Sequence, residues 1–286
     1  MMDLTDYQQI RDLLSLHGFR FSKSMGQNFL TASWVPERIA DAAALDASTG
    51  VLEIGPGIGC LTVQLSRRAG RVLSVELDKR LKPVLAQTLS GCDNTEVVFG
   101  DALKLDLQSL VEEEFLSRHL RPVVCANLPY NVTSPILTKL TALGCFDVIT
   151  VMIQREVARR ICAQPGEEDY SAFGILMQWY AEPELLFDVP PSCFVPQPKV
   201  TSTVISLKRR PAPPASVQDE KLLFAIVRAA FNQRRKTLPN ALASGIPGLS
   251  REKVESALRT MGLDPRIRGE ALSIASFSRL SDLLSS

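Results

Sequence analysis

The chain is poor in histidine: its 286 residues include only His17 and His119. A catalytic triad needs a histidine beside its nucleophile, and multi-histidine zinc sites need several. Neither histidine lies near a chemical partner in the sequence, so we interpret both as ordinary surface or hydrogen-bonded residues. We therefore expect no histidine triad and no metal centre.

The six cysteines are widely spaced and include no Cys-x-x-Cys pair. This spacing is typical of reduced thiols in a cytosol and not of a disulfide framework or a zinc site. Residues 1–6 are polar and acidic, and no apolar run is long enough to span a bilayer. We expect a cytoplasmic protein that has no membrane segment.

Charge is nearly balanced at a net +1, so the total does not identify a partner. Residues 215–286 hold 11 Lys and Arg against 7 Asp and Glu, whereas residues 1–214 hold 21 against 24. A basic C-terminal region is typical of a module that meets phosphate, although a solvated charged face explains the same numbers. The proline-rich stretch 208–215 has the composition of a linker. We expect two domains, residues 1–210 and 216–286.

Short apolar runs alternate with helical patterns through the first domain. We expect helices in residues 1–45, then strands at 51–54, 71–76, 96–99, 122–126 and 148–153, with helices at 61–68 and 81–89. This alternation is typical of βαβ units, so we predict an α/β fold with a mostly parallel sheet covered on both faces. Two later strands, 185–189 and 204–207, are separated by a proline-rich loop and should form an antiparallel hairpin at the sheet edge.

The C-terminal region should be all-helical. Ser216 and Asp219 have capping-box spacing, which predicts a helix from about Val217, and we expect that helix to continue through 231–238. Ser250 is the expected N-cap of a second helix, which should end near Gly262. A last helix should cover 274–284.

The first motif with chemical content is Glu53-Ile54-Gly55-Pro56-Gly57-Ile58-Gly59, directly after a strand. Glycines there let the backbone turn tightly and approach a ligand closely. A dinucleotide fingerprint needs G-x-G-x-x-G, but Cys60 stands where the third glycine should be. The spacing therefore favours a nucleoside without phosphates, such as S-adenosylmethionine (SAM), over NAD. A tight strand–helix turn without a ligand remains the alternative.

Acidic residues follow the next two strands. Glu76 can accept hydrogen bonds from both ribose hydroxyls, and Asp101, or the backbone beside it, can read an adenine amine. Singly, each could be a helix cap. Together they are a stronger signal, because ligands of such sheets bind at the carboxyl ends of the strands.

The sequence Asn127-Leu128-Pro129-Tyr130 follows strand four. An aromatic amine is a poor nucleophile because its lone pair is delocalised into the ring. If the Asn127 side-chain oxygen and the Pro129 carbonyl accept its hydrogens, the lone pair can point at the methyl group of SAM. Tyr130 offers a face on which an extruded base can stack. The motif predicts methylation of an exocyclic amine without a general base.

These segments resemble the bacterial small-subunit rRNA adenine dimethyltransferase family (KsgA/RsmA). The resemblance runs from about Lys23 to the C-terminus and is carried by Gly26 to Leu30, Glu53 to Gly57, Asn127 to Tyr130, Gln154 to Ala158, Phe194-x-Pro196-x-Pro198-Lys199-Val200 and Phe231 to Leu238. Arg155 departs from the family, which more often has Lys there, but the charge is kept. The resemblance implies a Rossmann-like class I SAM-dependent methyltransferase with a seven-stranded sheet and a small all-α C-terminal domain.

The resemblance also implies which residues act. SAM would be bound by Asn28, Leu30, Gly55, Gly57, Glu76, Asp101 and Asn127, and the adenine would be held by Asn127, Leu128, Pro129, Tyr130 and Phe194. Phe194 would stack on the second face of the base. The product would be N6,N6-dimethyladenosine at two adjacent adenines in a hairpin loop near the 3′ end of the small-subunit rRNA, made by a monomer acting on an assembling subunit.

The basic run Arg234-Arg235-Lys236 would contact the rRNA backbone and position the enzyme without reading sequence. A solvated helix end is the alternative for these residues. Three other functions stay open: methylation of adenine in large-subunit rRNA, methylation of DNA or of protein glutamine, and a mainly non-catalytic role in ribosome assembly. The DNA and protein enzymes typically carry Asn-Pro-Pro-Tyr or Asp-Pro-Pro-Tyr, whereas this chain has Leu128.

Overall fold

The computed structural model describes residues 2–19 and 27–285, and contacts divide the chain into two compact units. Unit 1 comprises residues 1–158 and 182–209, and unit 2 comprises 159–181 and 210–286. The expected division assigned 159–181 to the first domain, but this segment packs with the C-terminal helices. None of the helices in the described residues is long and apolar enough to cross a membrane.

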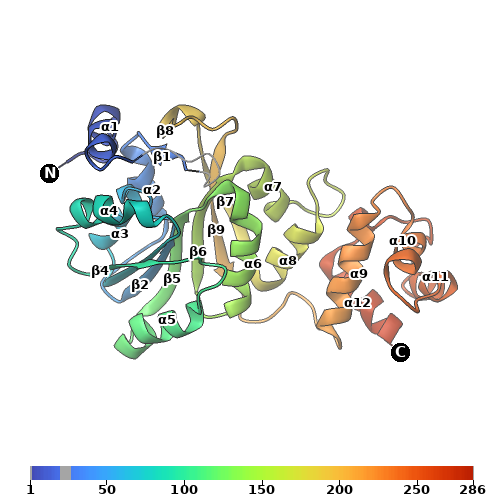
Figure 1. Ribbon diagram of the computed structural model, residues 1–286. Helices are drawn as coiled ribbons and strands as arrows, with labels where there is room; N and C mark the ends of the chain where they lie inside the picture. Colours follow the sequence, from blue (N-terminus) through green and yellow to red (C-terminus); the bar gives the residue numbers. More distant parts are fainter. Residues whose placement is uncertain (1, 20–26, 286) are drawn as a thin grey trace. The chain divides into compact units, whose positions relative to one another are not determined.

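Unit 1 is built around a seven-stranded sheet in the order β4-β3-β2-β5-β6-β9-β7 (Figure 1). The strands are β2 (Thr49–Ile54), β3 (Arg71–Glu76), β4 (Thr95–Phe99), β5 (Arg121–Asn127), β6 (Val148–Gln154), β7 (Ala181–Val189) and β9 (Ser202–Arg209). β4, β3, β2, β5 and β6 are parallel, whereas β9 runs antiparallel to β6. The predicted Rossmann-like fold with a mostly parallel seven-stranded sheet is confirmed. The two late strands are neighbours, with β7 at the edge.

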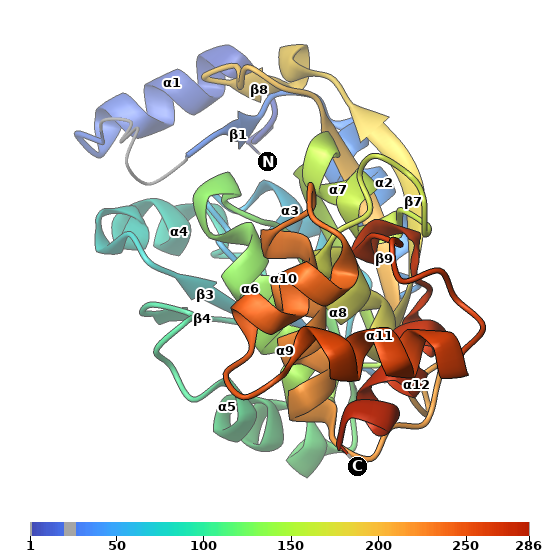
Figure 2. The same cartoon turned by 90° about the vertical axis from the view of Figure 1, so that its right-hand side faces the viewer.

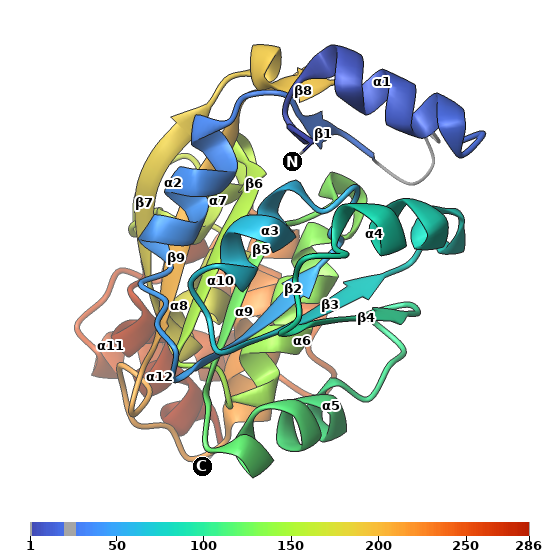
Figure 3. The ribbon, with the colours of Figure 1, turned by 90° about the vertical axis from the view of Figure 1, so that its left-hand side faces the viewer.

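Nearly every residue of the central strands is buried, because helices cover the sheet. Val51, Val72 and Val123 pack against α2 (Trp34–Ala42) and α3 (Cys60–Ser66), which lie on one face (Figure 3). Their neighbours Leu52 and Leu73 point to the other face and are equally buried. The other helices that begin in this unit are α1 (Tyr7–Leu16), α4 (Lys82–Thr88), α5 (Leu107–Glu114), α6 (Thr133–Leu143) and α7 (Arg155–Cys162).

A small second sheet was not expected from the sequence. β1 (Phe29–Leu30) pairs antiparallel with β8 (Phe194–Val195), so that Leu30 is opposite Phe194. The pairing joins two of the family-like motifs that are far apart in the chain. The apolar side chains of both strands pack into the hydrophobic clusters of unit 1.

Unit 2 is helical (Figure 2). Its helices are α8 (Ala172–Tyr180), α9 (Glu220–Asn232), α10 (Leu238–Gly245), α11 (Arg251–Thr260) and α12 (Ile274–Ser285). Trp179 and Tyr170 from the 159–181 segment are buried in the same core as Leu223 and Phe277, which explains why that segment belongs here. The predicted cap of α11 is confirmed, since the Ser250 side chain accepts from the Lys253 amide.

Two expectations for α9 were wrong. Its N-cap is Asp219, which accepts from the Leu222 amide, so the helix begins later than the spacing of Ser216 and Asp219 indicated. The helix also ends at Asn232 instead of continuing to Leu238. Pro239 occupies the first turn of α10, where a proline starts a new helix and cannot extend an existing one. Arg234-Arg235-Lys236 therefore lies in the turn between two helices.

Candidate active site

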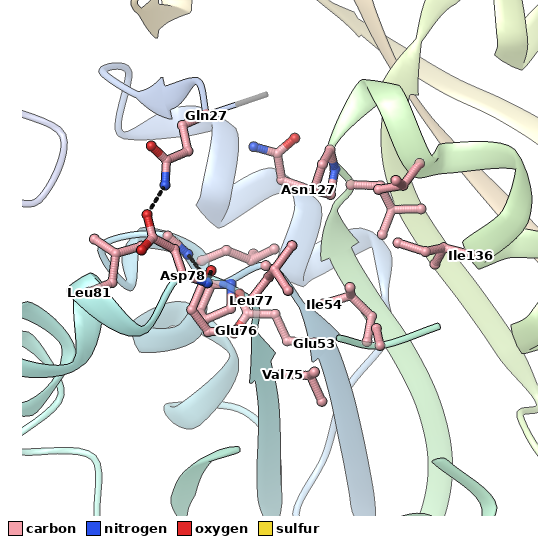
Figure 4. Close-up of a pocket in the computed structure, with 18 of the residues that line it drawn as sticks. Gln27, Glu53, Ile54, Val75, Glu76, Leu77, Asp78, Leu81, Asn127 and Ile136 are labelled. Atoms are coloured by element: carbon pink, nitrogen blue, oxygen red, sulfur yellow. Dashed lines mark hydrogen bonds between the residues drawn. The ribbon is translucent and has the colours of Figure 1, made fainter. Parts of the chain in front are cut away.

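A cavity of about 220 Å³ opens at the carboxyl ends of the parallel strands in unit 1 (Figure 4). This is the edge at which ligands of α/β sheets bind. Its lining includes all of the predicted cofactor residues and the whole turn after β5, namely Asn28, Leu30, Gly55, Gly57, Glu76, Asp101, Asn127, Leu128, Pro129 and Tyr130. The fold thus brings together five segments that are separate in the sequence. Gly26 lies outside the described residues.

The glycine loop after β2 presents bare backbone to the cavity. Gly55 and Gly57 have φ of +75° and +60°, a conformation that other residues rarely adopt. A Cβ added to Gly57 would lie 3.2 Å from the ring of Phe29. Glycine is needed at this position for both conformation and space, so the loop can lie directly against a ligand.

Glu76 ends β3 with its carboxylate already oriented by the backbone. Its Oε1 accepts from the Asp78 amide at 2.7 Å and its Oε2 from the Gly57 amide at 3.3 Å. The side chain is 6% exposed, and burial raises the pKa of Glu76 above its usual value. Each oxygen retains a lone pair, so the carboxylate can still accept from two neighbouring hydroxyls.

Apolar residues at the ends of β3 and β4 were missed by the sequence analysis. Leu77 is 54% exposed and Leu103 is 36% exposed, and both line the cavity. Leu77 directly follows the predicted acid Glu76, and Leu103 lies two residues after the predicted acid Asp101. Exposed leucines there could give a flat base an apolar contact. Their positions just after the two strand ends were the signal available in the sequence.

Asn127 faces the cavity from the side opposite Glu76 and Asp78 (Figure 4). Among the described residues, no hydrogen bond engages its side-chain amide, so its oxygen is available to a ligand. The neighbouring Tyr130 is held through its hydroxyl, which lies 2.5 Å from the Oγ of Ser202 on β9. Burial raises the pKa of Tyr130 above its usual value. The turn therefore holds an amide and an aromatic ring in defined positions.

The carbonyl that we expected to assist Asn127 is already engaged. The Pro129 oxygen accepts from the Thr133 hydroxyl at 3.0 Å and from the Val132 amide at 3.3 Å. Those donors belong to the turn and helix that follow, so both lone pairs have partners. No hydrogen bond from a described residue reaches the carbonyl of Leu128, which is the better second acceptor. The sequence could not separate these adjacent carbonyls, because the choice depends on the turn.

Phe194 does not line the cavity. Its side chain is 2% exposed and packs in the same apolar cluster as Leu30 and Val35. The pairing of β1 with β8 places it there. A base could stack on Phe194 only after this packing had changed, so its predicted role stays a prediction.

Asp78 is a further residue that the sequence analysis did not single out. It is 3% exposed and accepts from Gln27 Nε2 at 2.9 Å, which is the dashed contact in Figure 4, and from both Nε and Nη2 of Arg80. The Arg80 guanidinium holds the pKa of Asp78 below its usual value. Asp78 thereby ties the segment before β1 to the end of β3.

Glu53, the acid that begins the glycine motif, is fully buried at the cavity wall. Its Oε2 accepts from the hydroxyls of Thr62 at 2.7 Å and Ser74 at 2.6 Å. Burial raises the pKa of Glu53 to about 7, with a smaller contribution from the charge of Glu76. The group therefore changes protonation near neutral pH.

This pKa predicts a pH-dependent stability that Glu53→Gln should remove. The folded state holds the proton up to about pH 7, but the unfolded chain releases it near the usual value of 4.5. The free energy of unfolding should therefore fall as pH rises through this window, by about 3 kcal/mol. Urea titrations of both proteins from pH 4.5 to 8 measure this. Parallel curves for the wild type and Glu53→Gln would contradict the pKa assignment.

Comparison with known proteins decides the family. The family model described as ribosomal RNA adenine dimethylase matches residues 18–286. The chain belongs to this family. A relative from Geobacillus thermodenitrificans, ribosomal RNA small subunit methyltransferase A, is 47% identical over 99% of this chain and 97% of its own length.

Solved structures of similar proteins agree with the dimethylase assignment. A dimethyladenosine transferase from Plasmodium falciparum has a TM-score of 0.73 at 26% identity, with 88% of this chain and 95% of that one covered. The 23S rRNA methyltransferase ErmE has a TM-score of 0.65 at 29% identity, with 90% and 100% covered. The chain is thus a SAM-dependent enzyme of the dimethylase family.

The residues that line the cavity carry chemical groups that suit SAM. Glu76 could supply acceptors for ribose hydroxyls, the loop at Gly55 and Gly57 offers open backbone, and Asp101 and Leu103 could contact an adenine. These residues would hold the nucleoside part of SAM, and Asn28 and Leu30, which line the same cavity, would hold its methionine part. Four acidic residues in this lining, Glu53, Glu76, Asp78 and Asp101, disfavour a pyrophosphate group there.

Proposed function

We propose that this protein transfers methyl groups from SAM to the N6 amine of two adjacent adenines in a hairpin loop near the 3′ end of small-subunit rRNA. The product would be N6,N6-dimethyladenosine, formed late in subunit assembly. The observation that carries the proposal is the position of Asn127, whose amide has no hydrogen bond to a described residue and faces the cavity that also contains Glu76 and the glycine loop. We further propose that the enzyme works as a monomer in the cytoplasm, where its ribosomal substrate is assembled.

The mechanism follows from the turn after β5. Bound SAM supplies an electrophilic methyl group. In the first transfer, the Asn127 side-chain oxygen and the Leu128 carbonyl accept the two hydrogens of the adenine amine, which pulls the nitrogen toward a tetrahedral geometry. Its lone pair then points into the cavity, while Tyr130 stacks on the base. In the second transfer, the monomethylated amine has one hydrogen left, and one of these two oxygens accepts it. The amine becomes cationic once it has been methylated, so its proton leaves to water and no protein base is needed.

The small ribosomal subunit is favoured as substrate over the large one by the relatives. Proteins named small subunit methyltransferase A match this chain at 46–47% identity over 99% of its length, against 29% for ErmE. The basic turn between α9 and α10 supports an rRNA-facing unit 2. A role mainly in subunit assembly is the second candidate, which methylation assays and binding assays can separate.

Within that basic turn, the three cations have different surroundings. Arg234 donates to the carbonyl of Glu168 at 3.0 Å and lies 3.5 Å from a carboxylate oxygen of Glu270. It therefore holds the 159–181 segment to the C-terminal helices. Arg235 and Lys236 are exposed and form no ion pair with a described residue. We assign rRNA backbone contact to Arg235 and Lys236, and a mainly structural role to Arg234.

These two roles predict different effects for two variants. The double variant Arg235→Ala/Lys236→Ala should weaken subunit binding and reduce the slope of log K against log salt by about 2, while its melting temperature stays unchanged. Arg234→Ala should lower the melting temperature. Lys221→Ala, which removes one exposed cation at the far end of α9, is the control for loss of positive charge elsewhere in unit 2 and should leave the salt slope unchanged. An unchanged salt slope in the double variant would remove these residues from the interface.

The proposed function is tested with small subunits from cells that lack this methylation. The subunits are incubated with the purified protein and methyl-labelled SAM, and the rRNA is then digested to nucleosides. Labelled N6,N6-dimethyladenosine from a 3′-end hairpin supports the proposal. Label on large-subunit rRNA, DNA or protein would change the substrate, and SAM binding without any labelled product would favour the assembly role.

A further inference from the structure

Lys139 on α6 uses its ammonium group in an unusual way. Nζ lies 3.0 Å from the carbonyl oxygen of Ala102, 3.0 Å from that of Leu103 and 2.7 Å from that of Leu105. A lysine ammonium has three N–H donors and no acceptor, so all of its hydrogen-bonding capacity is directed at one loop. Its hydrogen-bond partners among the described residues are backbone carbonyls and not carboxylates.

The loop that Lys139 holds forms one wall of the cavity. Asp101, Ala102 and Leu103 line it. The loop is also tied from within, because the Leu103 amide donates to Asp101 Oδ1 at 3.0 Å and the amides of Lys104 and Leu105 donate to the Asp101 carbonyl at 2.9 Å. Its amides thus point toward Asp101, and three of its carbonyls converge on Nζ.

A cation stabilises carbonyl groups that converge on one point. The oxygens carry partial negative charge, and without the ammonium they would repel one another and lose charge-assisted hydrogen bonds. The loop would then relax away from this conformation. Because Asp101 and Leu103 belong to it, their positions at the cavity depend on a residue outside the cavity.

Helix α6 connects this loop to the catalytic turn. The hydroxyl of Thr133, its first residue, donates to the Pro129 carbonyl at 3.0 Å. One turn before Lys139, Ile136 lines the cavity and is 4% exposed. A single helix therefore contacts the turn that carries Asn127, the cavity wall and the loop after β4.

We propose that Lys139 is a positioning residue for SAM, whose ammonium holds the loop 101–105 in the conformation that receives the adenosine part. The inference rests on the proposed SAM site. Lys139 touches neither SAM nor the target base, so its loss should weaken SAM binding much more than it slows transfer from bound SAM.

The test compares Lys139→Met with the wild type by isothermal titration calorimetry with SAM. Methionine keeps the length and apolar stem of lysine but removes all three donors. We expect Kd to rise by about tenfold or more, and KM for SAM to rise in parallel, while kcat at saturating SAM changes by less than about threefold. Lys208→Met, an exposed lysine on β9 outside this cavity, has the same charge change and should bind SAM as the wild type does.

A second variant keeps the inference testable if Lys139→Met does not fold. Lys139→Gln retains an amide with two N–H donors, so its Kd should lie between those of the wild type and the methionine variant. Wild-type-like SAM binding by folded Lys139→Met or by Lys139→Gln would overturn the inference, and so would a fall in kcat without a change in Kd. Failure of the wild type itself to bind SAM would instead refute the SAM site.

Discussion

Asn127→Ala is expected to reduce methyl transfer at saturating SAM and rRNA by about 10³-fold. The side-chain oxygen of Asn127 faces the cavity next to the Leu128 carbonyl, and no described residue donates a hydrogen bond to it. Without it, one amine hydrogen has no acceptor and the lone pair stays delocalised in the ring. Single-turnover assays with small subunits measure the rate directly.

Asn127→Asp is the matched variant for this position. A carboxylate oxygen can still accept the amine hydrogen, so this change should retain more activity than alanine. SAM affinity should be measured for both variants, because Asn127 is also expected to contact the cofactor. If Asn127→Ala keeps more than about a tenth of the wild-type rate, the amide does not orient the amine. Retained subunit binding by the inactive variant would let the catalytic and assembly roles be tested separately in cells.

Glu76→Ala should weaken SAM binding by about 100-fold or more. Two hydrogen bonds from ribose hydroxyls to a buried carboxylate are each worth about 1.5–3 kcal/mol, and the loss of both exceeds two orders of magnitude in affinity. The Glu76 carboxylate is already fixed by the amides of Gly57 and Asp78, so little reorganisation opposes binding. Titration calorimetry with SAM gives the affinity.

Two further variants show whether the effect is local. Glu76→Gln keeps one acceptor oxygen and should lose less affinity than alanine. Glu96→Ala removes an acid on the neighbouring strand β4, outside the cavity, and should bind SAM normally. Thermal melts must accompany the titrations, because Glu76→Ala also leaves two backbone amides without their acceptor. A Glu76→Ala protein that is folded and binds SAM within about threefold of the wild type would remove the ribose contact from the proposed site.

Much of unit 1 could be predicted from local patterns. The strand Arg71–Glu76 was predicted to the residue, and the other parallel strands to within two residues at each end. Buried parallel strands are short apolar runs between turns, so their signal lies within a few adjacent residues. The positions of Glu76, Asp101 and Asn127 at strand ends then placed them at one edge of the sheet.

Other features depended on contacts between distant segments. Phe194 has the pattern of a loop residue, but pairing with Leu30 buries it. Lys139 reads as an ordinary helix lysine, although its ammonium meets three carbonyls more than thirty residues earlier in the chain. Such partners leave no mark on neighbouring residues, so no periodicity or spacing identifies them.

The sequence by itself determined the α/β class, the glycine loop, the acids and the Asn127–Tyr130 turn, because strand periodicity and strand-end motifs are local properties of the chain. Only the tertiary structure decided that the Pro129 carbonyl near Asn127 is already engaged, where α9 ends, and that residues 159–181 pack with the C-terminal helices. These depend on which donors and apolar side chains meet when distant segments fold together. Burial and hydrogen bonding between such segments are set by the complete packing and not by neighbouring residues.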